Sequence, residues 1–297
     1  MNLSTPMSGI VLMILSTLVF SVQDAITKML VQELPVAQIV FVRFVAFAIF
    51  ACLFATVNGG LRTALRSLVP VRQLIRCLLM CSEIALFALA LRVLGLAEVH
   101  ALFACFPLVV AALSVPILGE KVGHRRWMAV IVGFIGTLII LRPGLAVFDP
   151  NALIPLVCAV IFALYNLLTR QVSRRDSFAT SLVYFGITGA VASGLFAWPL
   201  WQPLNPATIK LLALLCATSI CGHMMLIKAL QLTEAVVLQP FHYLVLIWTL
   251  TIGYVFFRET VDGPTLLGAG IVAFSGIYVA YREFVLSRSN AGNQGVA

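Results

Sequence analysis

The feature that most constrains this chain is its succession of long apolar runs separated by short polar connections. Most of these runs approach the roughly 20 residues that a helix needs to cross a bilayer. The ten runs are 9–27, 37–57, 73–94, 98–118, 127–141, 152–170, 178–198, 208–228, 235–256 and 264–282. The connections carry turn residues, as in Asn58-Gly59-Gly60 and Arg142-Pro143-Gly144. The pattern predicts an all-α polytopic membrane protein with ten transmembrane helices.

Composition supports this interpretation and excludes several classes of protein. Of the 297 residues, 62% are hydrophobic and only 10% are charged, whereas an average soluble domain has roughly 25% charged residues. The mean hydropathy is +1.08. A soluble enzyme, a disordered chain and a secreted disulfide scaffold are therefore excluded. The seven cysteines all fall inside apolar runs, so we interpret them as small hydrophobic residues and expect neither disulfides nor a metal site.

The distribution of basic residues predicts the direction of the chain in the membrane. Thirteen of the 19 Lys and Arg residues lie in the even-numbered connections and near the termini, five lie on the other side, and Arg43 lies within a run. Because cytoplasmic loops of membrane proteins are enriched in Lys and Arg, both termini are expected in the cytoplasm. This bias also accounts for the net charge of +8, so no nucleic-acid partner is expected.

The chain contains an internal repeat with a period near 140 residues. In order along the chain, 24–28 aligns with 166–170, 92–98 with 228–234, 119–122 with 258–261, and 134–136 with 274–276. The repeat predicts two five-helix halves, 1–146 and 147–282, followed by a tail, 283–297, that is expected to be disordered and cytoplasmic. Because five is odd, the second half must enter the membrane from the opposite side. Such inverted repeats are typical of transporters that work by alternating access.

Several of these residues resemble a known family. Arg92, Glu98, Pro107 and the segments 118–121 and 141–143 resemble the EamA-type repeat of the drug/metabolite transporter superfamily. The resemblance implies ten helices in an inverted five-plus-five arrangement and the export of small metabolites across the bacterial inner membrane. Within this superfamily, the chain resembles the bacterial exporters of amino acids, including aromatic ones, and the resemblance implies a solute of that class. A permease for sugars, nucleosides or purines is the alternative, and a passive channel is a further one.

Charged residues within the apolar runs are the first candidates for a solute site. Asp24, Arg43 and Glu83 lie in the first three runs, where a charged side chain costs about 2.5–3.5 kcal/mol to insert and therefore needs a partner or a watery cavity. One interpretation is that Arg43 only neutralises an acid and holds the helices together. The other is that the cluster binds the two ends of a zwitterion, or that Glu83 carries a coupling proton.

Neutral and aromatic residues complete the predicted cavity. The full set of predicted lining residues is Gln23, Asp24, Arg43, Glu83, Phe87, His100, Phe103, Tyr165, Asn166, Gln239, His242, Tyr243 and Trp248. A histidine in an apolar helix can equally be a neutral core residue, and an aromatic one can face lipid. Pro107 and Pro240 lie within helices and are expected to form gating bends, although proline is also frequent in membrane helices.

An enzymatic function is not expected. The sequence contains no Walker A motif, no His-Glu-x-x-His and no Gly-x-Ser-x-Gly, and its four histidines are scattered. We therefore expect no catalytic residues, no metal and no cofactor. The expected partners are a small-molecule solute and the lipid bilayer. The oligomeric state is not specified by the sequence, and a monomer is compatible with the predicted function.

Overall fold

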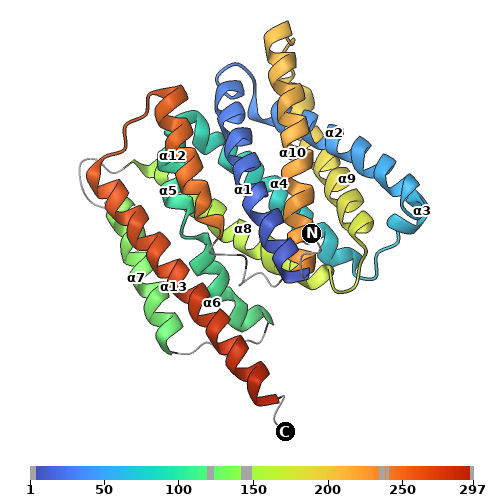
Figure 1. Ribbon diagram of the computed structural model, residues 1–297. Helices are drawn as coiled ribbons and strands as arrows, with labels where there is room; N and C mark the ends of the chain where they lie inside the picture. Colours follow the sequence, from blue (N-terminus) through green and yellow to red (C-terminus); the bar gives the residue numbers. More distant parts are fainter. Residues whose placement is uncertain (1–4, 119–123, 142–148, 234–237, 239–240, 295–297) are drawn as a thin grey trace.

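The computed structural model describes residues 5–118, 124–141, 149–233, 238 and 241–294 (Figure 1). Within these residues, every regular element is helical. The helices of the first half are α1 (Thr5–Leu30), α2 (Val36–Val57), α3 (Leu61–Ala64), α4 (Pro70–Val93), α5 (Leu96–Phe103), α6 (Phe106–Leu118) and α7 (His124–Leu141). Those of the second half are η1 (Pro150–Ala152), α8 (Leu153–Val172), α9 (Phe178–Ala197), η2 (Trp198–Leu200), α10 (Pro206–Leu232), α12 (Leu244–Phe257) and α13 (Gly263–Gln294).

The lengths of these helices confirm the prediction of a polytopic membrane protein. Six stretches of the described chain are long and apolar enough to cross a membrane: Met7–Leu30, Val36–Val57, Pro70–Val93, Pro150–Val172, Phe178–Leu200 and Pro206–Leu232. Shorter apolar helices correspond to the other predicted runs: Leu96–Val110, Trp127–Ile140, Leu244–Phe257 and Gly263–Ser275. Many large apolar side chains are exposed on the outside of these helices, as expected where the solvent is lipid.

The structure differs from the predicted spans at the fourth run. This run is not one helix, because α5 ends at Phe103 and α6 begins at Phe106. Pro107 is therefore the second residue of α6, a position in the first helical turn where a proline removes no intrahelical hydrogen bond. The chain changes direction at Ala104 and Cys105, before the proline.

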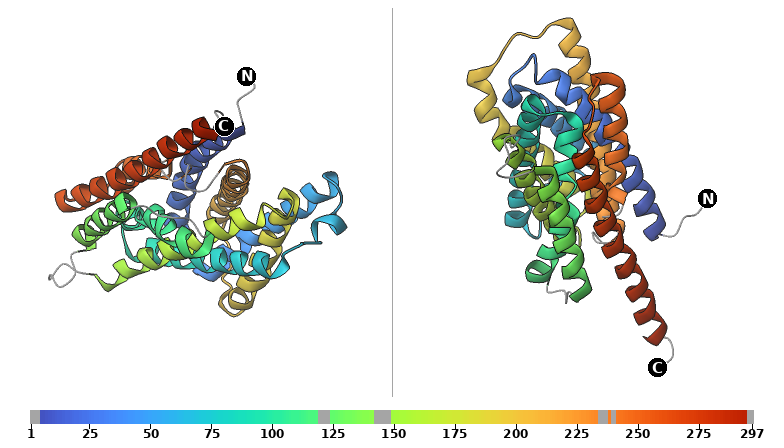
Figure 2. Two further views of the ribbon diagram at one scale, coloured as in Figure 1. Left: turned by 90° about the horizontal axis from the view of Figure 1, so that it is seen from below. Right: turned by 90° about the vertical axis from the view of Figure 1, so that its left-hand side faces the viewer.

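The end of the chain also differs from the prediction. Helix α13 continues to Gln294, beyond the predicted end of the last span at residue 282. Residues 283–294 are therefore helical and do not form the disordered tail that their composition suggested, because this segment contains no proline and only one late glycine to interrupt the helix. In Figure 2, the C-terminal part of α13 projects beyond the other helices.

The two halves are packed into each other rather than side by side. Helix α1 packs against α10, α2 against α9, α4 against α8, and α7 against α13. In the repeat, α1 corresponds to α8, α2 to α9, α4 to α10 and α6 to α12. Each contact between the halves then has a counterpart. The α1–α10 contact matches α8–α4, the α1–α12 contact matches α8–α6, and the α4–α9 contact matches α10–α2. This exchange is what two copies of one unit produce when a two-fold axis relates them.

The helix directions agree with that relation. In Figure 1, α4 rises from the lower side of the view, whereas α10, its counterpart by the repeat, descends from the upper side. The aligned basic residues also make equivalent contacts. Lys28 Nζ donates to the Leu94 carbonyl at 2.8 Å, and Arg170 donates to the carbonyls of Leu230 and Gln231 at 2.9 and 3.1 Å. Each basic residue thus ties the end of one helix to the end of a neighbour within the same half.

Helices α7 and α13 form a pair at one edge of the bundle, as Figure 1 shows. Their closest approach is at two glycines: a Cβ added to Gly136 would lie 2.9 Å from the Gly268 carbonyl, and one added to Gly268 would lie 2.6 Å from the Gly136 carbonyl. Small residues at such positions let helix backbones come together in lipid. The pair therefore supports the bundle from outside.

Candidate functional site

A cavity lies between the two halves, at the centre of the bundle. Its free volume is about 80 Å³. It is lined by Phe20, Gln23, Asp24, Thr27, Arg43, Met80, Glu83, Ile84, Phe87, Ala88, His100, Phe103, Ala104, Phe106, Phe162, His223, His242, Tyr243, Val245 and Leu246. The cavity therefore receives side chains from α1, α2, α4, α5, α6, α8, α10 and α12 and from the residues just before α12, but none from α7, α9 or α13.

Among the described residues that line the cavity, Arg43 is the only Arg or Lys. It projects from α2 and is 5% exposed. Its Nε donates to Ser219 Oγ on α10 at 2.6 Å. Its two terminal nitrogens have no hydrogen-bond partner in the described chain, and no carboxylate there lies within 4.0 Å, although Asp24 and Glu83 are close enough to interact with it electrostatically. The interpretation of Arg43 as a simple structural ion pair is therefore not supported by its contacts.

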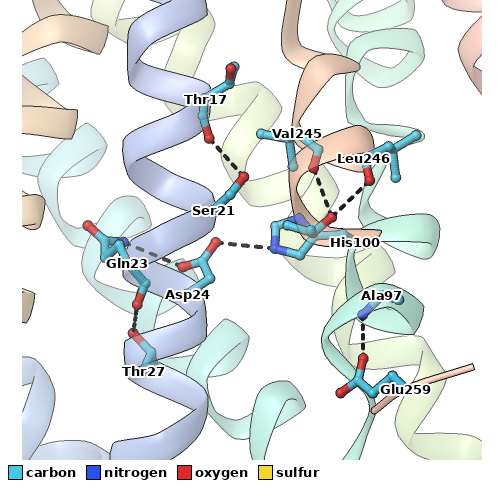
Figure 3. Close-up of polar contacts among 11 residues, drawn as sticks. Thr17, Ser21, Gln23, Asp24, Thr27, Ala97, His100, Val245, Leu246 and Glu259 are labelled. Carbon is cyan, nitrogen blue, oxygen red and sulfur yellow. Dashed lines mark hydrogen bonds and ion pairs between the residues drawn. The ribbon is translucent and has the colours of Figure 1, made fainter. Parts of the chain in front are cut away.

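Asp24 faces a histidine rather than the arginine. Figure 3 shows its carboxylate pointing from α1 to the ring of His100 on α5, with 3.2 Å between Asp24 Oδ2 and His100 Nε2. Gln23 lies beside it, and its Nε2 is 3.5 Å from Asp24 Oδ1. Asp24 therefore has a partner of its own on α5, and Arg43 interacts with Asp24 only electrostatically.

Glu83 is the least satisfied charged group of the cavity. It projects from α4, is 5% exposed, and its carboxylate has no hydrogen-bond or ion-pair partner among the described residues. A buried carboxylate without a partner is costly, because its desolvation is not compensated. Glu83 therefore marks a place where a cationic group or a proton belongs.

Aromatic rings form most of the remaining wall. Phe103 contacts Phe87, Phe106 and Phe162 with centroid distances of 5.2, 5.1 and 5.5 Å. Phe106 in turn meets the ring of His242 edge to face at 4.7 Å. Edge-to-face and tilted packing of this kind is the favourable geometry for aromatic rings. The wall suits a flat apolar or aromatic group of a solute.

The second half adds neutral polar atoms without partners. The Nε2 atoms of His223 and His242 and the hydroxyl of Tyr243 are buried and make no hydrogen bond with the described residues. His223 Nδ1 lies 3.1 Å from the Ser219 carbonyl. Since a carbonyl only accepts, Nδ1 carries the proton and Nε2 is left as an acceptor. These three atoms are therefore able to form hydrogen bonds with polar groups of a solute.

Most of the residues predicted from the sequence meet at this cavity. Gln23, Asp24, Arg43, Glu83, Phe87, His100, Phe103, His242 and Tyr243 all line it. Three others do not. Tyr165 lies behind Phe162, Asn166 donates to the Phe162 carbonyl at 2.7 Å, and Trp248 lies farther along α12. Gln239 and Pro240 lie outside the described residues.

Two residues at the site were not identified from the sequence. His223, which lines the cavity, was grouped with scattered histidines, and Ser219, which contacts the lining residue Arg43, has no distinctive local sequence pattern. The repeat offers a signal for both. Helices α4 and α10 begin at Pro70 and Pro206, 136 residues apart. This offset aligns His223 with Phe87. It also places Ser219 at the position of Glu83.

One end of the cavity is bordered by a charged contact, which we call the Lys28–Glu259 closure. Lys28 Nζ lies 2.9 Å from Glu259 Oε1, and Glu259 accepts from the backbone N–H groups of Leu96 and Ala97 at 2.9 and 3.0 Å. Figure 3 shows the contact with Ala97. Burial opposes ionisation of Glu259, but these two N–H groups and Lys28 outweigh it and hold its pKa below the ordinary value. The closure joins α1, the start of α5 and the segment before α13.

A second polar contact joins the halves toward the opposite end of α4. Arg76 is fully buried and donates to Gln73 Oε1 at 2.7 Å, to Thr169 Oγ1 at 3.3 Å and to the Ser181 carbonyl at 2.8 Å. Gln73 also donates to Asp176 at 2.8 Å. Arg76 was counted from the sequence as a basic residue at the membrane surface. The structure corrects this, because the side chain is enclosed between α4, α8 and α9.

The comparisons with known proteins agree with the fold. Residues 7–142 and 151–282 each match the EamA-like transporter family. A protein of Rickettsia prowazekii (strain Madrid E) named S-adenosylmethionine uptake transporter is 27% identical over 95% of both chains. A riboflavin transporter of Vibrio cholerae serotype O1 is 29% identical over 95% of this chain and 96% of its own, and a pseudopaline exporter of Pseudomonas aeruginosa is 28% identical over 96% and 98%.

A solved structure also resembles this one. It superposes with a TM-score of 0.64 at 17% sequence identity and covers 93% of this chain and 94% of its own. At that identity, the likeness concerns the fold alone.

Proposed function

Because this chain belongs to the EamA-like transporter family, we propose that it is a secondary transporter of small amino-acid-type metabolites whose side chain carries an aromatic or other apolar group. The observation that carries the proposal is the unpaired Arg43–Glu83 set inside an aromatic cavity. A guanidinium fork matches a carboxylate, and a carboxylate matches an ammonium. The two charges of an α-amino acid fit these groups, and the aromatic wall receives the rest of the solute.

The proposed mechanism is alternating access. The halves 1–146 and 147–282 act as the two inverted units, and the cavity between them opens first to one side and then to the other. The reciprocal packing of α1, α4, α8 and α10 supports this, because related units can exchange roles with little difference in energy. Arg43 and Glu83 remain with the solute throughout, while the contacts at the two ends of the bundle open in turn. Pro107, just after the break between α5 and α6, is proposed to lie at a bend that moves in this cycle.

The names of the relatives support the solute class but not one direction. S-adenosylmethionine contains an α-amino acid and a planar adenine, and riboflavin contains a planar ring system. One of the relatives is named for uptake and another for export. A carrier binds its solute on both sides, so the direction of net flux follows the solute gradient and any coupled ion. We propose export of the amino-acid solute, with Glu83 as the group that could take a coupling proton.

The cellular location follows from the family and from charge. We propose the bacterial inner membrane, with both termini in the cytoplasm. The thirteen-to-five distribution of Lys and Arg supports this direction. The oligomeric state is not specified by the cavity, which is built within one chain.

A second candidate is a permease for uncharged aromatic solutes such as nucleosides or purines, with sugars as a weaker variant. The unpartnered nitrogens of His223 and His242 favour it, since they can accept hydrogen bonds from a heteroaromatic ring. The riboflavin transporter among the relatives agrees with this candidate. It leaves Arg43 and Glu83 without a role in recognition, and so ranks second.

The test is counterflow in proteoliposomes that contain the purified protein. Vesicles preloaded with unlabelled L-tryptophan, L-phenylalanine, S-adenosylmethionine, riboflavin, adenosine or glucose are diluted into the labelled form of the same solute. We expect saturable counterflow for the amino-acid-type solutes and at least tenfold less with Arg43→Met, because the carboxylate loses its partner. Equal, non-saturating flux of all six indicates a channel. Counterflow of adenosine or glucose alone contradicts the proposal and favours the second candidate.

A further inference from the structure

The charged groups of the cavity belong to one half of the molecule. Among the described lining residues, Asp24, Arg43 and Glu83 all come from the first half, whereas the second half contributes Phe162, His223, His242 and Tyr243 together with aliphatic side chains. The repeat aligns Asp24 with Asn166 and Glu83 with Ser219. Each acid is thus replaced by a neutral residue in the second half. The two units have similar backbones but divide the charge unequally.

Arg43 connects the two halves through the neutral replacement. Ser219 is 1% exposed and accepts from Arg43 Nε at 2.6 Å. Its own carbonyl faces His223 Nδ1 at 3.1 Å, and the His223 ring stacks on Phe185 with a centroid distance of 5.0 Å. The helical turn of α10 that carries Ser219 is therefore held in place by its own contacts, and the hydroxyl is a fixed acceptor.

The type of residue at position 219 decides what Arg43 can bind. An acid there would accept the fork of the guanidinium in a paired geometry and neutralise it. The Ser219 hydroxyl accepts one hydrogen bond from Arg43, from Nε, and carries no charge. The two terminal nitrogens then stay available, and the buried positive charge stays without an anion at ion-pair distance in the described chain. Burying a cation this way is costly unless a ligand supplies the anion.

We infer that Ser219 is a positioning residue that aims the guanidinium of Arg43 at the carboxylate of the solute, so that the solute binds in one orientation relative to the two halves. The charged end of the solute lies against the first half, with the solute carboxylate at Arg43 and the solute amino group at Glu83. The ring lies against Phe162, His242 and Tyr243 of the second half. This inference rests on the proposed function and adds the requirement for both charges of the α-amino acid.

The orientation has a consequence for specificity. A solute that lacks the carboxylate leaves Arg43 unpaired, and one that lacks the amino group leaves Glu83 unpaired. Each loss leaves a buried charge in the cavity without its partner, which weakens binding beyond the loss of one contact. The two analogues should therefore respond to different substitutions, and Ser219 should affect only those solutes that carry a carboxylate.

The experiment measures dissociation constants of the purified full-length protein for three indoles. These are L-tryptophan, tryptamine, which lacks the carboxylate, and indole-3-propionate, which lacks the amino group. With Ser219→Ala, we expect affinity for L-tryptophan and indole-3-propionate to fall about tenfold, as for a lost hydrogen bond to a charged group, while affinity for tryptamine changes less than twofold. Ser219→Glu should abolish the preference for L-tryptophan over tryptamine.

Two further variants serve as controls. Ser219→Thr retains the hydroxyl and should keep the wild-type ratio of affinities. Thr218→Ala removes a hydroxyl that bonds to its own helix, at the carbonyls of Leu214 and Leu215, and should leave all three affinities unchanged. Both variants also show whether α10 tolerates substitution at this turn.

The outcomes separate the inference from the proposed function. If the wild-type protein binds none of the indoles and transports no amino-acid-type solute, the proposed function is wrong and the inference falls with it. If the wild-type protein binds L-tryptophan but Ser219→Ala weakens all three indoles by the same factor, the proposed function stands and the positioning role of Ser219 is overturned.

Discussion

At the scale of single residues, burial separates charges that have structural partners from charges that do not. Arg76 is fully buried, yet its hydrogen bonds to Gln73, Thr169 and Ser181 use protein acceptors. Arg43 is buried to a similar extent and has one such bond. Both side chains lie in apolar surroundings, so we attribute the difference in their hydrogen bonding to different roles. Arg76 holds α4 to α8 and α9, whereas Arg43 is left able to bind a ligand.

This difference predicts opposite effects of removing the two arginines. Arg76→Met should lower the free energy of unfolding by about 1–3 kcal/mol, because Gln73 and the Ser181 carbonyl lose a buried donor. Arg43→Met should change stability less and reduce binding of carboxylate solutes more. Thermal unfolding in detergent measures the first effect. Arg72→Ala is the control, since Arg72 is exposed one turn earlier on the same helix. An Arg76→Met protein as stable as the control would contradict this assignment.

At the scale of the elements, the start of α5 depends on a residue far away in the sequence. Glu259 accepts from the N–H groups of Leu96 and Ala97 and pairs with Lys28. A negative charge at a helix N-terminus is favourable, since the first N–H groups have no partner within the helix. The Lys28–Glu259 closure therefore orders α5, the helix that presents His100 to Asp24.

The lowered pKa of Glu259 predicts how this closure responds to pH. A carboxylate with a depressed folded-state pKa stabilises the fold fully above its ordinary value of 4.5 and loses that contribution as pH falls through the lower folded-state pKa. The difference in melting temperature between wild type and Glu259→Gln should be constant from about pH 7 to 5 and shrink below 4.5. Glu33→Gln, at an exposed site, is the control. A difference that grows on acidification would show the assignment to be wrong.

At the scale of the whole molecule, each half is completed by the other. The helices of the first half find their main partners in the second, and the cavity is lined by both. Alternating access then requires that contacts between the halves separate at one end while those at the other end stay closed. The Lys28–Glu259 closure and the Arg76 contacts lie toward opposite ends of α4 and are two of the polar contacts between the halves that could open in turn.

The closure can be tested by covalent bridging. In a variant without the seven native cysteines, Lys28→Cys and Glu259→Cys are joined by a short thiol-cleavable linker. Bridging should reduce counterflow at least tenfold, because α1 can no longer separate from the segment before α13, and cleavage of the linker should restore it. Each single-cysteine variant, treated in the same way, should transport as before treatment. Unchanged transport by the bridged protein would show that the halves need not separate there.

The sequence by itself determined the class of the protein and much of its cavity. Long apolar runs can only be satisfied as helices in lipid, and a charge such as Asp24, Arg43 or Glu83 within them needs a partner or a cavity. Ser219 and His223 were not recognised, because a serine or histidine in an apolar helix has no distinctive local pattern. Their role depends on which helix of the other half faces them.

Only the tertiary structure decided which charges meet. Depth along each helix allowed Arg43 to reach either Asp24 or Glu83, yet in the fold Asp24 faces His100 and Arg43 bonds to Ser219. The spacing of apolar residues likewise did not predict the break between α5 and α6, nor did it predict that Arg76 is buried. Helix rotation and the packing of the two halves set these contacts, and both arise from side-chain packing between segments far apart in the chain, which periodicity along one segment does not encode.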